Sequence, residues 1–202
     1  DRRRPDGMYR LAWAYRQSSQ FQQSMETIRD YVESYPRQKQ YADALFYGGT
    51  WAREHAMEDE TIIYYTKFIN SFRGDSRLSK AQDNLLPTLK GRELHSEAIA
   101  VYQQISTSKK ASQSRKRSAQ ASILKMQFQY GDRLKAIAAA KQVLKQVPRQ
   151  SSEAGLAYFV IASEAVRNNR FSQAQRLARE LAKINGRHFL ASEALSLVYL
   201  AS

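Results

Sequence analysis

The residues of this chain that could act in acid–base or metal chemistry are its three histidines, and their spacing does not suit either role. His55, His95 and His188 lie far apart in the sequence, whereas a helical zinc pair places two histidines four residues apart. The chain has no cysteine, so disulfides and cysteine metal sites are excluded. We therefore expect surface histidines, no metal site and no cofactor.

Acidic residues gather once, in the stretch "MEDET" at residues 57–61. No glycine-bearing calcium loop accompanies them, and acids are favoured in the first turn of a helix by its dipole. The stretch therefore predicts a helix start. The sequence also lacks a Gly-x-Ser-x-Gly elbow, a phosphate-binding loop and a dinucleotide fingerprint. We expect a protein that is not an enzyme.

The charge balance leaves two interpretations open. Lys and Arg number 32 against 19 acids, a formal net charge of +13, which would attract an anionic polymer or lipid over about 10 Å in ordinary salt. Alternatively, these residues are the solvated outer faces of helices. The most basic stretch, "SKKASQSRKRS" at 108–118, includes Lys110, Arg115 and Arg117. It lacks the interleaved aromatic residues that nucleic-acid binding favours.

Composition indicates helix throughout. Proline and glycine are few, 4 and 8 residues, and the Val and Thr that strands favour are sparse. The longest apolar run, Leu156 to Ala162, is far shorter than the roughly 20 residues that cross a membrane, so we expect no transmembrane segment. The opening "DRRRPDG" suggests either a cut within a longer protein or a processed start.

A small residue recurs at a nearly constant step of 37, 37, 38 and 38 residues. These anchor positions are Ser24, Thr61, Ala98, Ala136 and Ala174. Apolar residues follow each anchor four and seven positions later, as in Ile28 and Tyr31, and so form one stripe per helix. A constant step combined with helical periodicity is typical of a helical solenoid.

The segments before each anchor repeat with the same spacing. Twelve residues ahead of the anchors stand Ala12, Gly49, Leu86, Leu124 and Ala162, which predicts a second set of helices in close approach to the first. Pro36 and Pro148 lie twelve residues after their anchors, where a helix must end. Gly91 and Gly131 are expected in the turns, and Pro87 predicts a bend within a helix.

This pattern resembles the tetratricopeptide repeat family. The best match is residues 8–36, with Leu11, Ala12, Tyr15, Ser24, Ile28, Tyr31 and Pro36 at the signature places. The step is longer than the family's, which is about 34 residues. The resemblance implies an all-α, right-handed superhelix forming a single domain over 1–202. Its hairpins are expected at about 6–36, 41–73, 78–108, 114–148 and 152–185, with a partial sixth at 189–202.

Two stretches carry a narrower resemblance. "YVESYPRQKQYADALFYGG" and "YYTKFINSFRGDSRLSKAQDNL" are similar to bacterial envelope proteins of this family, such as the lipoprotein of the outer-membrane barrel-assembly machinery and the periplasmic TolA-binding coordinator. The later half is similar to tetratricopeptide proteins of Bacteroidetes. The resemblance implies the periplasm or the outer-membrane periphery, with the cytoplasm as the alternative.

The resemblance also implies a partner site. In the family, a peptide or partner protein lies in a concave groove lined by the first helix of each pair, and aromatic residues mixed with Arg and Lys suit such a ligand. Carried over by register, the groove positions are Tyr9, Trp13, Arg16, Asp43, Phe46, Arg53, Lys80, Asp83, Lys90, Lys125, Phe128 and Phe159. The alternative is that several of these rings, Trp13 and Phe159 above all, pack against the neighbouring pair.

The end of the chain, "EALSLVYLAS" at 193–202, is apolar and has no partner segment after it. Further sequence or a second copy of the chain would cover it, so homo-oligomerisation through this last hairpin is a second expectation about partners.

The register predicts how the anchors respond to substitution. Ala98→Leu, Ala136→Leu or Ala174→Leu should cost roughly 1–3 kcal/mol of stability, because the larger side chain forces helices apart. The same change at Ser112, expected on the solvent face, should be nearly neutral.

Overall fold

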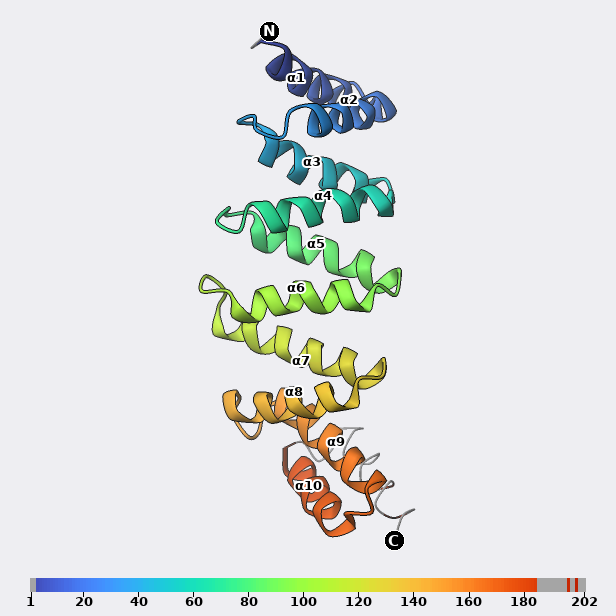
Figure 1. Ribbon diagram of the computed structural model, residues 1–202, viewed down its shortest axis with the longest axis vertical. Coiled ribbons are helices and arrows are strands. Elements are labelled where there is room, and N and C mark those ends of the chain that lie inside the picture. Colours follow the sequence, from blue (N-terminus) through green and yellow to red (C-terminus); the bar gives the residue numbers. More distant parts are fainter. Residues whose placement is uncertain (1–2, 185–195, 197–198, 200–202) are drawn as a thin grey trace. The chain divides into compact units, whose positions relative to one another are not determined.

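In the computed structural model, residues 3–184, 196 and 199 are described, and helices joined by turns and short connections make up this part of the chain (Figure 1). Neither a strand nor a strand bridge occurs among these residues, which confirms the predicted all-α fold class. Ten helices are present in the described ranges: α1 Arg3–Gln17, α2 Phe21–Ser34, α3 Tyr41–Glu54, α4 Glu58–Ser71, α5 Leu78–Gly91, α6 His95–Thr107, α7 Gln113–Gln129, α8 Arg133–Gln146, α9 Ser152–Arg167 and α10 Phe171–Ile184.

The chain divides into two compact units, residues 1–94 and 95–202. In unit 1, which contains α1 to α5, each helix packs on the helices before and after it, and α3 also contacts α5. Unit 2 contains α6 to α10 and follows the same scheme, with α7 also in contact with α9. The expected single domain over 1–202 stays a prediction. The expected partial pair at 189–202 lies outside the described residues, except for Ser196 and Tyr199.

The five anchor positions are all buried, as the repeat register predicted. Ser24, Ala98, Ala136 and Ala174 have no exposed surface, and Thr61 has 1%. The apolar stripe seven residues after each anchor is buried as well: Tyr31, Phe68, Ile105, Val143 and Leu181. Each even-numbered helix therefore turns the same face into the core.

Small residues let the helices of a pair approach closely. The Ser24 hydroxyl donates a 2.8 Å hydrogen bond to the Ala12 carbonyl, which joins α2 to α1 at the predicted pair of positions. In the next pair, a Cβ added to Gly49 would lie 3.0 Å from the Tyr65 ring. Real Cβ atoms rarely come that close, so a larger residue at this position would have to push the Tyr65 ring away from α3.

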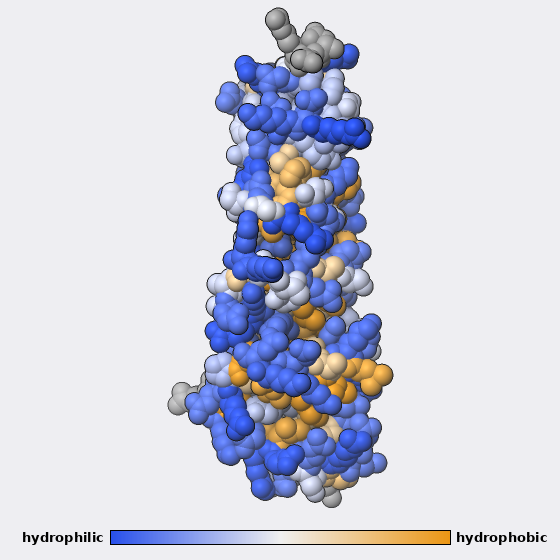
Figure 2. Space-filling view, turned by 60° about the vertical axis from the view of Figure 1, so that its left-hand side comes forward, coloured by the Kyte–Doolittle hydropathy of each residue, from blue (hydrophilic) through white to orange (hydrophobic). Residues whose placement is uncertain are grey.

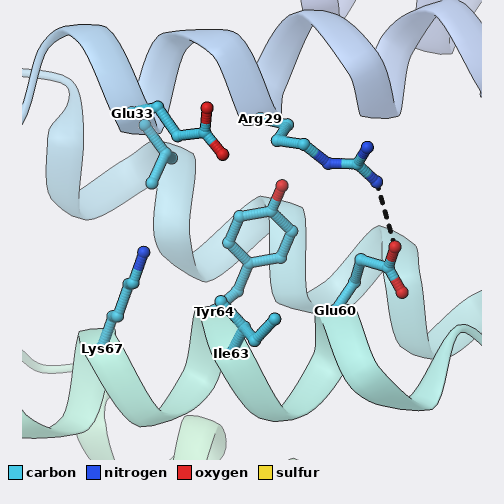
Figure 3. A pocket seen from close by; sticks show the side chains of 7 residues that line it. Arg29, Glu33, Glu60, Ile63, Tyr64 and Lys67 are labelled. Atoms are coloured by element: carbon cyan, nitrogen blue, oxygen red, sulfur yellow. Dashed lines mark hydrogen bonds and ion pairs between the residues drawn. The ribbon is translucent and has the colours of Figure 1, made fainter.

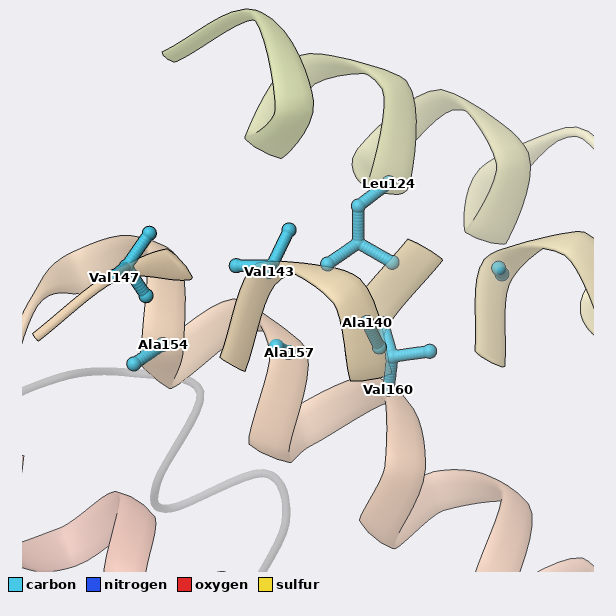
Figure 4. Packing of buried hydrophobic residues seen from close by; sticks show 8 residues of the cluster. Leu124, Ala140, Val143, Val147, Ala154, Ala157 and Val160 are labelled. Carbon is cyan, nitrogen blue, oxygen red and sulfur yellow. The ribbon is translucent and has the colours of Figure 1, made fainter. Parts of the chain in front are cut away.

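Unit 2 is packed around short aliphatic side chains. Leu124 of α7, Ala140 and Val143 of α8, and Ala157 and Val160 of α9 meet in one buried cluster (Figure 4). These residues are at most 1% exposed. Alanine and valine allow three helices to meet with little space between their backbones, because interaxial distance depends on the side chains at the contact.

The helices of each pair are joined by a tight turn with one residue in the left-handed region. These residues are Ser19, Ala56, Glu93, Gly131 and Asn169, and they repeat at the same step as the anchors. In four of the turns, the amide of the next residue donates to a carbonyl five residues back, as from Met57 to Ala52 at 2.9 Å. This is the Schellman arrangement that ends a helix.

The structure confirms one expected turn glycine and corrects the other. Gly131 has φ +112° and lies in the turn after α7. Gly91 is the last residue of α5, and the left-handed position falls two residues later, at Glu93. The prediction failed because the helix continues through Gly91, and the turn tolerates a non-glycine residue in the left-handed region at a cost in backbone energy.

Prolines end helices where the register predicted. α2 ends at Ser34 and α8 at Gln146, each two residues before its proline, Pro36 or Pro148. Pro87 behaves differently: it is exposed, and α5 continues through it to Gly91. A proline cannot donate the usual helical hydrogen bond, so α5 has one bond fewer at this position.

One pair of repeat positions links consecutive pairs of helices. In each case, the residue three positions before one anchor contacts the residue six positions before the next anchor. The first such contact is between Phe21 and His55, whose rings stack at a centroid distance of 3.4 Å. The equivalent contact in unit 2 stacks His95 on Tyr130 at 3.4 Å. Between them in the chain, Arg92 pairs with Glu58 at 3.4 Å. Two of the three histidines therefore serve in packing.

Ser112 is not the neutral control position that the sequence suggested. Its hydroxyl accepts a hydrogen bond from the Arg115 amide and caps the N-terminus of α7. Losing such a cap costs about 0.5–2 kcal/mol, so Ser112→Leu should destabilise the protein for a reason unrelated to the register. Ala138 is the better control, because it is exposed on the same helix as Ala136.

We expect Ala136→Leu to lower the free energy of unfolding by roughly 1–3 kcal/mol, because the fully buried site has no room for three more carbon atoms. Ala138→Leu should change it by less than about 0.5 kcal/mol. Urea unfolding followed by circular dichroism measures both. Equal tolerance at the two positions would contradict the register.

Candidate partner-binding surface

Aromatic side chains of α1 and α3 meet in one cluster in unit 1. The Trp13 ring lies edge-on to Tyr47 at a centroid distance of 4.9 Å and to Trp51 at 5.0 Å. Trp51 is 4% exposed, whereas Tyr9, Trp13 and Tyr47 are half-buried. We call Tyr9, Trp13, Tyr47 and Trp51 the aromatic cluster. Edge-to-face packing of this kind holds rings rigidly.

Tyr9 extends the cluster toward α2. Its ring lies 6.5 Å from Trp13 and 5.7 Å from Tyr31. Burial raises the pKa of Tyr9 above its ordinary value of 10.0, and a hydrogen bond with Trp13 partly opposes the shift. The Tyr9 hydroxyl therefore stays protonated at physiological pH and can both donate and accept a hydrogen bond.

A salt bridge joins the same two helices beside the cluster. Arg16 of α1 pairs with Glu54 of α3 at 2.6 Å, and both side chains are partly exposed, 31% and 41%. An exposed pair of this kind adds little stability. It does place one charge of each sign, already held in position, on the helices that carry the aromatic rings.

A second charged group lies near Tyr9. Arg77 binds Asp43 of α3 at 2.7 Å and Asp75 at 2.8 Å, and its guanidinium lies over the Phe46 ring at 5.1 Å. Hydrogen bonding to Asp75 raises the pKa of Arg77, with Asp43 adding to the effect against the opposing cost of burial. Arg77 is thus engaged in ion pairs within the protein, and it holds Asp43 in place near Tyr9. The charge of Asp43 raises the pKa of Tyr9, and the charge of Arg77 lowers it.

The predicted groove residues of α1 come together, but those of α3 do not all face outward. Tyr9, Trp13 and Arg16 share one face of α1, as the spacing predicted. Trp13 also packs on Tyr47 of α3, so the alternative interpretation, in which this ring packs against the neighbouring pair, holds as well. Phe46 is 4% exposed, enclosed by Tyr65, Phe68 and Arg77. The Phe46 prediction is corrected, since a ring covered on these sides has little surface to offer a partner.

The remaining predicted residues are dispersed. In unit 1, Arg53 is exposed at the end of α3. Lys80, Asp83 and Lys90 are exposed on α5. Lys125 is exposed on α7 in unit 2, and Phe128 on the same helix is half-buried against Phe159 at 5.7 Å. Phe159 itself is 5% exposed and belongs to the core. This agrees with the alternative interpretation, in which the ring packs inside the protein and does not line the groove.

Sequence reasoning missed Tyr47 and Arg77. The series Asp43, Tyr47 and Trp51 runs at four-residue steps along α3, which places the three on one helix face. That stripe could have been found in the sequence. No sequence signal connects Arg77 to Asp43, because the two lie in different helical pairs and meet only through folding.

No metal centre or membrane segment is found in the described part of the chain. Its residues 3–184 bring no three His, Cys, Asp or Glu side chains into a group that could hold an ion. None of the helices described is both long and apolar enough to cross a membrane.

Glu58, Asp59 and Glu60 form the first turn of α4, as predicted, and the first two pair with Arg92.

Comparison with known proteins supports the repeat assignment for the first pair. The family model of the tetratricopeptide repeat matches residues 6–37, which span most of α1 and all of α2. No curated protein matches the chain. The resemblance inferred from residues 8–36 is therefore confirmed over that pair.

Among solved structures, the chain is similar to a tetratricopeptide repeat protein from Parabacteroides merdae, with a TM-score of 0.53 at 14% identity, covering 98% of this chain and 73% of that one. This likeness shows a helical-repeat fold. A second similar structure is a putative kinesin light chain from Podosopora anserina with nearly identical repeats. Its TM-score is 0.44 at 15% identity, over 98% of this chain and 94% of that one.

We expect the stability of the protein to fall between pH 10 and pH 12. Burial raises the pKa of Tyr31 and of Tyr64 from 10.0 to about 12. In this window, the unfolded chain loses these two protons while the folded chain keeps them, so the free energy of unfolding drops as pH rises, by about 2–3 kcal/mol per tyrosine.

Urea unfolding at several pH values measures this drop. Tyr31→Phe and Tyr64→Phe should each flatten the curve above pH 10, whereas Tyr130→Phe, at an exposed tyrosine, should leave its slope unchanged. A wild-type curve that is level between pH 10 and pH 12 would contradict the burial argument.

Proposed function

We propose that this helical-repeat chain, whose first pair matches the tetratricopeptide repeat, is a non-catalytic scaffold that binds a peptide or partner protein through the aromatic cluster of unit 1. Tetratricopeptide repeats generally mediate protein–protein interaction. The observation that carries the proposal is the rigid, partly exposed set Tyr9, Trp13 and Tyr47 on α1 and α3.

The chemistry of the cluster supports a peptide ligand. Half-buried rings already fixed by their neighbours offer contact area at a small cost in conformational entropy. The Tyr9 hydroxyl supplies a donor and an acceptor, and the Arg16–Glu54 pair places both signs of charge beside the rings. A peptide with an apolar residue next to charged residues would match these groups.

We further propose that the scaffold acts in the bacterial cell envelope, at the periplasm or the outer-membrane periphery, with the cytoplasm as the alternative. The support is the likeness of the Tyr-Pro stretch at residues 31–49 to envelope proteins. Immunoblotting of periplasmic, membrane and cytoplasmic fractions tests it, and recovery in the cytoplasmic fraction alone would rule out the envelope.

Peptides selected on the wild-type protein from a random phage-displayed library can test the site. We expect Tyr47→Ala to weaken a selected peptide about thirtyfold or more, because truncating an aromatic hot spot costs about 2 kcal/mol or more. Tyr130→Ala, which removes an exposed tyrosine of unit 2, should leave the affinity unchanged. Isothermal titration measures both, with thermal unfolding as the check on folding.

The outcome separates this proposal from binding of an anionic polymer or lipid. Affinity that changes little with salt and depends on Tyr47 supports the aromatic cluster. A steep fall with salt, together with loss on replacing Lys110, Arg115 and Arg117, would instead indicate a polyanion site. The homo-oligomer expected through residues 193–202 stays a prediction, since most of that stretch lies outside the described residues.

A further inference from the structure

The second helices of unit 1 enclose a pocket away from the aromatic cluster. It has a volume of about 290 Å³ and lies between α2 and α4 (Figure 3). α2 contributes Arg29, Val32 and Glu33. α4 contributes Glu60, Ile63, Tyr64 and Lys67. Two helices from consecutive pairs thus form its opposite sides.

The floor of the pocket is apolar and buried. Val32 is 4% exposed and Tyr64 is 3% exposed. The Tyr64 ring packs closely on α3, where a Cβ added to Gly48 would lie 3.3 Å from it. Its hydroxyl points from α4 toward α2 (Figure 3). Burial, the largest cause, raises its pKa to about 12, so the hydroxyl remains neutral and can donate.

Charged side chains differ at the two ends of the pocket. At one end Arg29 and Glu60 neutralise each other through a 3.0 Å ion pair (Figure 3). At the other end stand Glu33 on α2 and Lys67 on α4. Neither makes an ion pair with another described residue. This end therefore offers one negative and one positive group to a ligand.

The dimensions favour a side chain inserted from a partner protein over a free small molecule. Pockets for small ligands usually measure about 300–1,000 Å³ and enclose most of the ligand. This pocket is at the lower end, and Ile63 at its edge is 48% exposed. Figure 2 shows one face of the molecule, on which hydrophilic surface predominates and smaller apolar areas lie between. An aliphatic side chain could enter the pocket while the rest of its chain stayed outside.

We propose that this pocket is a second protein-binding site, which takes an apolar side chain flanked by a basic residue facing Glu33 and an acidic residue facing Lys67. The site is formed by second helices, whereas the aromatic cluster is formed by first helices, so it does not depend on the function proposed above. Its ligand would contact mainly Ile63, which is 48% exposed, while Val32 and the Tyr64 ring line the pocket beneath it with at most 4% of their surface exposed.

Methyl-labelled protein titrated with blocked tripeptides tests the site by nuclear magnetic resonance. The probes are acetyl-Lys-Leu-Glu-amide, acetyl-Glu-Leu-Lys-amide, the neutral acetyl-Ala-Leu-Ala-amide and free leucine. We expect one of the two charged tripeptides to shift the Ile63 and Val32 methyl signals saturably. It should bind more tightly than acetyl-Ala-Leu-Ala-amide and more tightly than free leucine. Glu33→Gln and Lys67→Gln should each weaken it about two- to fivefold, the range of an exposed ion pair.

Matched controls and a charge swap make the test decisive. Glu26→Gln on α2 and Lys39→Gln, which make the same charge changes at exposed positions outside the pocket, should leave the affinity unchanged. The double variant Glu33→Lys, Lys67→Glu should reverse the preference between the two charged tripeptides. No methyl shift, an unchanged preference in the double variant, or equal binding of free leucine would overturn the proposal.

Discussion

Close approach between neighbouring helices is the constraint on which this fold depends. A small side chain begins the buried face of each even-numbered helix, and at Ala136 and Ala174 it has no exposed surface. Gly49 shows how little space remains, since an added Cβ would lie 3.0 Å from the Tyr65 ring. Because the apolar stripe of one helix is covered only by its neighbours, burial repeats at the step of the sequence.

The repeat fixes where helices touch but leaves the chemistry of the contact free. One pair of equivalent positions carries a Phe21–His55 stack, then a Glu58–Arg92 ion pair, then a His95–Tyr130 stack. Aromatic stacking and an ion pair can both span the same gap at the helix ends. Differences between repeats, and not the repeat itself, are therefore where distinct surfaces arise.

Unit 1 carries two such surfaces. α1 and α3 gather partly exposed rings around Trp13, while α2 and α4 enclose a pocket over Tyr64. The pocket rests on the glycine pair of α3 in part, since Gly48 backs the Tyr64 ring, while Gly49 backs the buried Tyr65 ring of the core. Larger residues at these positions would displace the two rings.

The sequence by itself determined the helices, their register and the residues that face the core, because periodicity and helix-ending residues such as Pro36 and Pro148 act locally. Only the tertiary structure decided which partly apolar residues remain accessible. Phe46 is buried because Arg77 and Phe68, from later segments, cover its ring. Likewise, Glu33 and Lys67 share a pocket because α2 and α4 lie close in space, a placement that no local pattern encodes.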